Sequence, residues 1–179
     1  TASGIAQYEW AIGTSAGGSN VQPFTNVGTA TSGANSALAL ANGQTYYVTV
    51  RATDRIGFAT TASSDGVQVD TSAPVAGTVN DGVGVDVDTQ ASLTTIQANW
   101  SGFSDAGSGI AQYEWAIGTT SGGTNVQAFA GVGLSTSGAN SALVLANGQT
   151  YYVTVRVANG AGLTVTAASD GVKADATPP

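Results

Sequence analysis

The 179-residue chain contains no cysteine and no histidine. Without cysteine the fold cannot depend on disulfides, and redox compartment cannot be inferred. Without either residue, the chain cannot form a Ser-His-Asp or Cys-His catalytic arrangement or an ordinary zinc site. Most hydrolase chemistry is thereby excluded. An intrinsic enzyme is the least expected class of function, and no cofactor is predicted apart from a calcium ion considered below.

The chain is also poor in charge and in long apolar runs. Only 8% of its residues are charged, and 11 acids against 4 bases give a net charge of −7. Nucleic acid is not an expected partner, because there is no basic patch to displace counterions from phosphates. An anionic membrane surface is disfavoured for the same reason. Because no run approaches the roughly 18 apolar residues of a membrane span, we expect no membrane insertion.

What the sequence does contain is a repeat rich in Gly, Ala, Ser, Thr and Asn. The segment SGIAQYEWAIGT at Ser3–Thr14 recurs at Ser108–Thr119, an offset of 105 residues. The similarity continues to the last residue without insertion or deletion, and 49 of the 74 aligned positions are identical. A period of this size is typical of a tandem array of whole domains.

The two repeats are not equally long. Residues 71–179 hold a complete repeat with a C-terminal linker, whereas residues 1–70 have no counterpart of Val75–Asp105. We therefore predict that residues 1–70 form an incomplete repeat without its first two strands. The chain also has no methionine. Two interpretations stay open: the chain is a window on a longer array, or another copy donates the missing strands.

Strand signals alternate with turn signals throughout the complete repeat. The alternation predicts that three strands each direct aromatic side chains toward the core: Trp100 from the first, Tyr113 and Trp115 from the second, and Tyr151 from the third. Short strands separated by turn dipeptides such as Asn147-Gly148 predict an antiparallel β-sandwich of about seven strands. The expected strands are Ser92–Trp100, Ile110–Ile117, Val126–Val132, Ser141–Leu145, Thr150–Ala158 and Leu163–Val172.

These residues resemble the fibronectin type III family, one of the Ig-like folds. Tyr113 and Trp115 are similar to its third strand, and Trp100 to the tryptophan of its second strand. Leu145 and Tyr151 resemble its tyrosine corner, in which a Tyr hydroxyl bonds to nearby backbone. The first repeat carries the same residues at Trp10, Leu40 and Tyr46.

Longer motifs narrow the resemblance further. YEWAIGT, TYYVTVRA and SDGV followed by VDTSAP are similar to repeats of very large bacterial surface proteins. The resemblance implies an all-β fold of antiparallel Ig-like, fibronectin type III-like β-sandwiches in tandem. It also implies an extracellular or cell-surface location, although the motifs are specific for fold and not for function. The family's Arg-Gly-Asp cell-attachment tripeptide is absent, so integrin-type binding is not implied.

The expected function is structural: a stalk, spacer, sheath or filament subunit whose partners are neighbouring repeats or copies of itself. Two other functions stay open. An adhesive module would bind a glycan or a cell-surface protein through the Gly17-Gly18 and Gly122-Gly123 turns, or through outward-facing Tyr47 and Tyr152. A spacer attached to a separate catalytic domain is the third candidate.

Acidic residues concentrate near the junction of the repeats. Asp70, Asp81, Asp86 and Asp88 lie in a stretch without Lys or Arg. Calcium prefers roughly six to eight oxygen ligands, and junction loops could supply them, so these four aspartates are a candidate calcium site. The spacing does not match an EF-hand. The alternative is a set of solvated aspartates that keep the protein soluble.

Two further features concern the outer surface. Glu9 with Arg51, and Glu114 with Arg156, are placed to form cross-strand ion pairs, worth about 0 to 1 kcal/mol where exposed. A catalytic Glu is disfavoured because no second carboxylate is placed to share acid and base roles. Asn99 begins an Asn-Trp-Ser glycosylation sequon and is expected to face outward.

Overall fold

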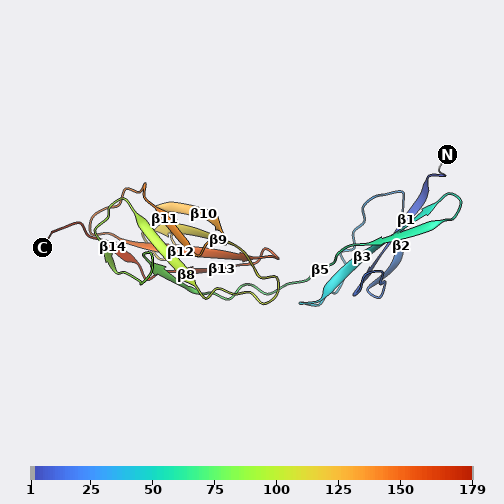
Figure 1. Ribbon diagram of the computed structural model, residues 1–179, viewed down its shortest axis with the longest axis horizontal. Helices are drawn as coiled ribbons and strands as arrows, with labels where there is room; N and C mark the ends of the chain where they lie inside the picture. The colour runs from blue at the N-terminus through green and yellow to red at the C-terminus, as the bar shows by residue number, and fades with distance from the viewer. Residues whose placement is uncertain (1–2, 179) are drawn as a thin grey trace. The chain divides into compact units, whose positions relative to one another are not determined.

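A computed structural model describes residues 3–178 of the chain. The described residues contain β-strands and no helix. The chain divides into two compact units, one ending at Asp70 and the other beginning at Thr71, which we call unit 1 and unit 2 (Figure 1).

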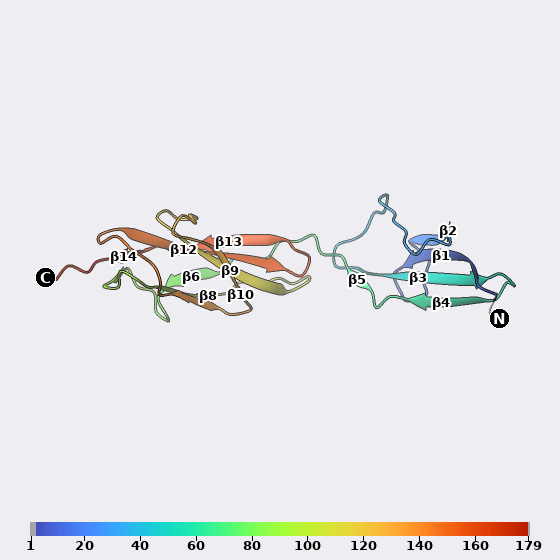
Figure 2. The ribbon, with the colours of Figure 1, turned by 90° about the horizontal axis from the view of Figure 1, so that it is seen from above.

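Unit 1 is a single antiparallel sheet (Figure 2). Its strand order is β2-β1-β3-β4, and β5 pairs with the beginning of β3. Within the described part of unit 1 no strand forms a second sheet. The strands are β1 (Ile5–Gly13), β2 (Gln22–Gly28), β3 (Thr45–Asp54), β4 (Ala59–Ser63) and β5 (Val67–Gln68).

Unit 2 has two sheets. The larger has the order β10-β9-β12-β14-β7, with β13 also paired to β12, and the smaller has the order β11-β8-β6. All pairings are antiparallel except that of β14 with β7. The strands are β6 (Thr78–Asp81), β7 (Thr89–Gln90), β8 (Ile96–Ser101), β9 (Ile110–Gly118), β10 (Gln127–Gly133), β11 (Ser137–Asn140), β12 (Thr150–Asn159), β13 (Thr164–Ala168) and β14 (Val172–Ala174).

The core of unit 2 lies between these two sheets. Trp100 from β8 packs with Tyr113 from β9 at a ring-centroid distance of 6.0 Å, and Trp115 and Tyr151 belong to the same buried cluster. Because successive side chains of a strand point to opposite faces, alternate residues of β8, β9 and β12 meet in one apolar layer. The tryptophans and tyrosines therefore fill the middle of a β-sandwich.

Three predicted strands need correction. The predicted strand Ser92–Trp100 begins only at Ile96, as β8. Ser141–Leu145 is not a strand; the strand is Ser137–Asn140, which pairs with β8. Leu143 and Leu145 are nevertheless buried, and their N–H groups donate to the carbonyls of Thr94 and Leu93. The predicted strand Leu163–Val172 is divided into β13 and β14, because Gly171 at φ 104° turns the chain between them.

The sequence Ser-Gly-Ala-Asn adopts different structures in the two units. Residues 137–140 form β11 in unit 2, where Gly138 lies opposite Ala98 of β8. The identical residues 32–35 of unit 1 form no strand. Since the local sequence is the same, the partner strand β8 decides the conformation, as expected of β structure that depends on tertiary pairing.

The missing layer also exposes apolar side chains that unit 2 buries. Val50 is 37% exposed, whereas its counterpart Val155 is 0% exposed. Val67 and its counterpart Val172 are 63% and 1% exposed. Identical residues on equivalent strands thus differ only in whether a second sheet covers them.

This difference predicts unequal costs for equivalent truncations. Val155→Ala should destabilise unit 2 by about 2 kcal/mol, because it removes buried methyl groups and leaves a cavity. Val50→Ala should destabilise unit 1 by less than about 1 kcal/mol, since the side chain is already partly solvated. Native-state hydrogen exchange, followed separately on strands of each unit, measures both costs. Equal costs at the two positions would contradict the single-layer structure of unit 1.

Candidate functional site

The inner face of the unit 1 sheet is open, and we call it the open face. It carries Tyr8, Trp10, Val48 and Val50, which line a hollow of about 380 Å³. A Cβ atom on Gly33 would lie 3.0 Å from the Trp10 ring, so the chain passes close over that ring. Trp10 is only partly buried, in contrast to Trp115. The open face is therefore an apolar surface with a partial cover.

The tyrosine corner is formed in both units. The Tyr151 hydroxyl accepts a hydrogen bond of 2.7 Å from the N–H of Ala146. The Tyr46 hydroxyl accepts one of 2.9 Å from the N–H of Ala41. Tyr46 is buried even though the open face beside it is not. This bond therefore fixes the loop before β3 or β12 whether or not the second sheet is present.

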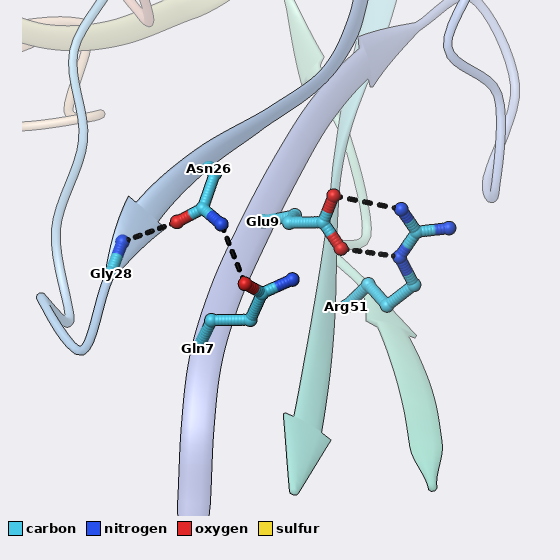
Figure 3. A network of polar contacts seen from close by, with 5 residues as sticks. All are labelled: Gln7, Glu9, Asn26, Gly28 and Arg51. Carbon is cyan, nitrogen blue, oxygen red and sulfur yellow. Dashed lines mark hydrogen bonds and ion pairs between the residues drawn. The ribbon is translucent and has the colours of Figure 1, made fainter. Parts of the chain in front are cut away.

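The outer face of the unit 1 sheet carries a polar network (Figure 3). Arg51 lies directly opposite Glu9 and binds both carboxylate oxygens, at 2.8 and 2.9 Å. The hydrogen bond from Arg51 lowers the pKa of the Glu9 carboxyl and keeps it ionised. The guanidinium also lies 4.4 Å from the ring centroid of Phe24. Beside the ion pair, Asn26 donates a hydrogen bond to Gln7.

Unit 2 repeats this arrangement. Arg156 donates to Glu114 at 2.8 Å and lies 4.1 Å from the ring centroid of Phe129. The phenylalanines were not identified from the sequence, although a signal was present, because Phe occupies this position in both repeats. Each arginine is held by a carboxylate and a ring at once. The Phe, Glu and Arg side chains thus connect three neighbouring strands of each sheet.

The glycine-rich turns are held by internal contacts. A Cβ atom on Gly13 would lie 2.4 Å from the backbone of Gly18, so the turn folds back on the strand that precedes it. Asn20 accepts a hydrogen bond from the N–H of Thr14 across the same turn. Gly118 and Gly123 repeat the contact in unit 2. These glycines are explained by close backbone approach.

The two tyrosines considered as ligand platforms are less available than expected. Tyr47 and Tyr152 are partly buried. A Cβ atom on Gly66 would lie 2.8 Å from the Tyr47 ring, and one on Gly171 would lie 2.7 Å from the Tyr152 ring. Each ring therefore packs against the glycine of an Asp-Gly turn.

The aspartates predicted to bind calcium do not all come together. The structure groups Asp81 and Asp86 with a third carboxylate, Asp170, which the sequence analysis did not select. Asp88 is exposed and Asp70 ends unit 1, and neither belongs to this group. Asp170 belongs to a Ser-Asp-Gly motif that occurs in both repeats, and this repetition was the sequence signal that could have identified it.

The sequon residue Asn99 has a structural role. Its side-chain amide donates to the carbonyls of Gly82 and Gly84, at 3.1 and 2.9 Å. It thereby fixes the loop that follows β6.

Residues 3–178 contain no long apolar helix of the kind that could span a membrane.

Comparison with known proteins identifies the fold and nothing narrower. No family model matches the chain, and no curated protein matches it. A crystal structure of consecutive domains from titin is similar to it, with a TM-score of 0.55 and 15% sequence identity. The similarity covers 95% of this chain and 55% of the titin chain, so this chain spans about half the length of that structure. The predicted antiparallel Ig-like, fibronectin type III-like β-sandwich fold is confirmed, and a fold by itself does not define a function.

The tyrosine corner leads to a stability prediction. Tyr151→Phe should destabilise unit 2 by about 1 to 2 kcal/mol, because the N–H of Ala146 loses its acceptor. Tyr46→Phe should have a similar effect on unit 1. Urea denaturation of the full chain, with hydrogen exchange to assign each transition, measures both. Tyr152→Phe, on the opposite face of β12, is the control and should change stability little; an equal loss in the control would refute the assigned role.

Proposed function

We propose that this chain is a structural segment of an extracellular array of fibronectin type III-like sandwiches, and that it serves as part of a stalk, spacer, sheath or filament. The observation that carries this proposal is the occurrence of the same sheet in both units, closed into a sandwich in unit 2 and open in unit 1. Repeats of one sheet joined in series suit a load-bearing role, because each repeat of an array contacts only its neighbours. The resemblance of its motifs to repeats of large bacterial surface proteins favours a cell-surface location for such an array.

The segment that begins unit 2 supports this role. Pro74 immediately precedes Val75, which is paired with Ser104 by backbone hydrogen bonds. The side-chain amide of Asn159 donates to the carbonyl of Ser72 at 2.9 Å. Proline limits backbone freedom, and these bonds attach the segment to the body of unit 2. The first residues of unit 2 are thus part of its fold.

The open face has an evident partner in the architecture of unit 2. There, Ile96, Ala98 and Trp100 of β8 cover the equivalent face and are all buried. We propose that a strand pair with the pattern of Val75–Phe103, contributed from outside these 179 residues, covers the open face. Burying a large apolar side chain contributes about 1.5 to 3 kcal/mol, and several such side chains lie on this face.

The number of covering segments limits where the strand pair can come from. This chain has two such sheets but only one covering segment, which unit 2 already uses. If copies of these 179 residues exchanged that segment, one sheet per copy would still be open. Such an exchange would cover one sheet and uncover another, so the exposed apolar area would stay the same. Simple exchange between copies of these 179 residues therefore gains nothing, and a second covering segment has to come from outside them.

The alternative is an adhesive module for a glycan or protein. It has less support, because the glycine-rich turns and the tyrosines considered for that role are occupied by internal contacts. Glycan binding by the full chain, lost on substitution of Tyr152, would favour it.

The test adds a synthetic peptide of residues 75–105 to the full chain. Hydrogen exchange should slow in β1 and β3 of unit 1, because the peptide covers the face that carries Trp10 and Val50. A matched peptide with Ile96→Asp and Trp100→Asp should have no effect, since it retains strand length but loses the apolar face.

Two outcomes would contradict the proposal. Unchanged exchange in β1 and β3 at saturating peptide would mean that the open face does not accept such a strand pair. Equal protection by the two peptides would mean that binding ignores the apolar pattern.

A further inference from the structure

Three carboxylates meet at one edge of the unit 2 sandwich. Asp81 is the last residue of β6, Asp86 lies in the loop after it, and Asp170 lies in the turn between β13 and β14. One oxygen from each lies within 4.8 Å of the others. A surface hollow of about 330 Å³ opens beside them and is lined by Asp86 and Asp170. Segments about 90 residues apart in the sequence thus bring three acids together.

No basic side chain neutralises this cluster. Within residues 3–178, none of the ion pairs includes Asp81, Asp86 or Asp170. Lys173, the nearest lysine in sequence, pairs with Asp175 instead. The three charges would repel one another without a counterion.

Asp81 supplies a second, independent indication of a ligand. Its side chain is fully buried. One carboxylate oxygen, Oδ2, accepts a hydrogen bond of 3.1 Å from the N–H of Gly171, whereas Oδ1 is buried without a hydrogen-bond partner. Buried polar atoms are rarely left unpaired, and the carboxylate that carries this one lies beside two further carboxylates. A bound cation would satisfy it.

The loop that carries Asp86 is already held in place. Asp86 Oδ1 accepts a hydrogen bond of 2.7 Å from the N–H of Asp81, and the N–H of Val87 donates to the carbonyl of Asp81. The amide of Asn99 fixes the same loop through Gly82 and Gly84. The ligands therefore need little rearrangement to bind an ion.

The electrostatics agree with the geometry. Burial raises the pKa of Asp81 to about 6, and the charges of Asp86 and Asp170 add to that effect. The Ser169 hydroxyl and the Gly171 N–H act in the opposite direction. The ionised form of Asp81 is thus disfavoured in the protein alone, and a cation would reverse this preference.

We propose that Asp81, Asp86 and Asp170 bind one divalent cation, and that this cation is calcium. Carboxylates without His or Cys form a hard oxygen ligand set, and the exposed side of the cluster leaves room for water to complete the coordination shell. The ion would tie the β6 edge of the smaller sheet to the turn between β13 and β14 of the larger sheet. It would therefore link the two sheets of the sandwich at one edge.

The test uses the full chain, freed of metal with a chelator and titrated with calcium chloride in a calorimeter. One equivalent should bind, and hydrogen exchange should slow in residues 81–88 and 168–172. Asp86→Asn and Asp170→Asn should each weaken calcium affinity at least about tenfold, because each removes a charged ligand. Both residues are exposed, so these variants should fold.

Unit 1 provides the matched control. Asp65 occupies the position equivalent to Asp170 in the same Ser-Asp-Gly motif, but residues 3–70 hold no counterpart of Asp81 or Asp86. Asp65→Asn should leave calcium binding unchanged. Absence of binding at millimolar calcium, or equal weakening by Asp65→Asn and Asp170→Asn, would overturn the proposal.

Discussion

The packing of β6, β8 and β11 over the β9–β12 sheet is the interaction on which the structure of unit 2 depends. It buries Trp100, Trp115 and Val155 in one layer, and the hydrophobic effect of that layer is what closes the sandwich. Unit 1 shows the same sheet without this packing. Its apolar residues are in place, and its strands pair in the same order, but the inner face is only partly covered. A sheet of this kind can form its ladder alone and still need a partner layer.

The outer face behaves differently, since it is the same in both units. The Glu–Arg pair and the stacked phenylalanine recur with closely similar distances, whether or not the inner face is covered. Cross-strand pairs on this face therefore stabilise strand order and register independently of the core. The chain separates two physical tasks: outer-face contacts define the sheet, and inner-face burial defines the sandwich.

This separation explains what the sequence could and could not predict. Alternating Tyr113 and Trp115 on β9 predicted the strand and its inner face, because that pattern is local. Residues 137–140 were missed as a strand, since identical residues 32–35 are irregular and only the partner β8 distinguishes them. The repeated Ser-Asp-Gly motif marks Asp170, but it does not indicate that Asp170 meets Asp81, 89 positions earlier in the sequence. Local alternation predicts strands, whereas long-range pairing decides which residues meet.

The covering segment connects the open face with the carboxylate cluster. Residues 75–105 supply both the strands that cover the sheet of unit 2 and two of the three clustered aspartates. Unit 1 lacks this segment but retains Asp65, the counterpart of the third aspartate. A strand pair of the same pattern that covered unit 1 would therefore bring two carboxylates to Asp65 while it buried Trp10 and Val50. Core formation and cation binding would then be coupled, because one segment delivers the ligands for both.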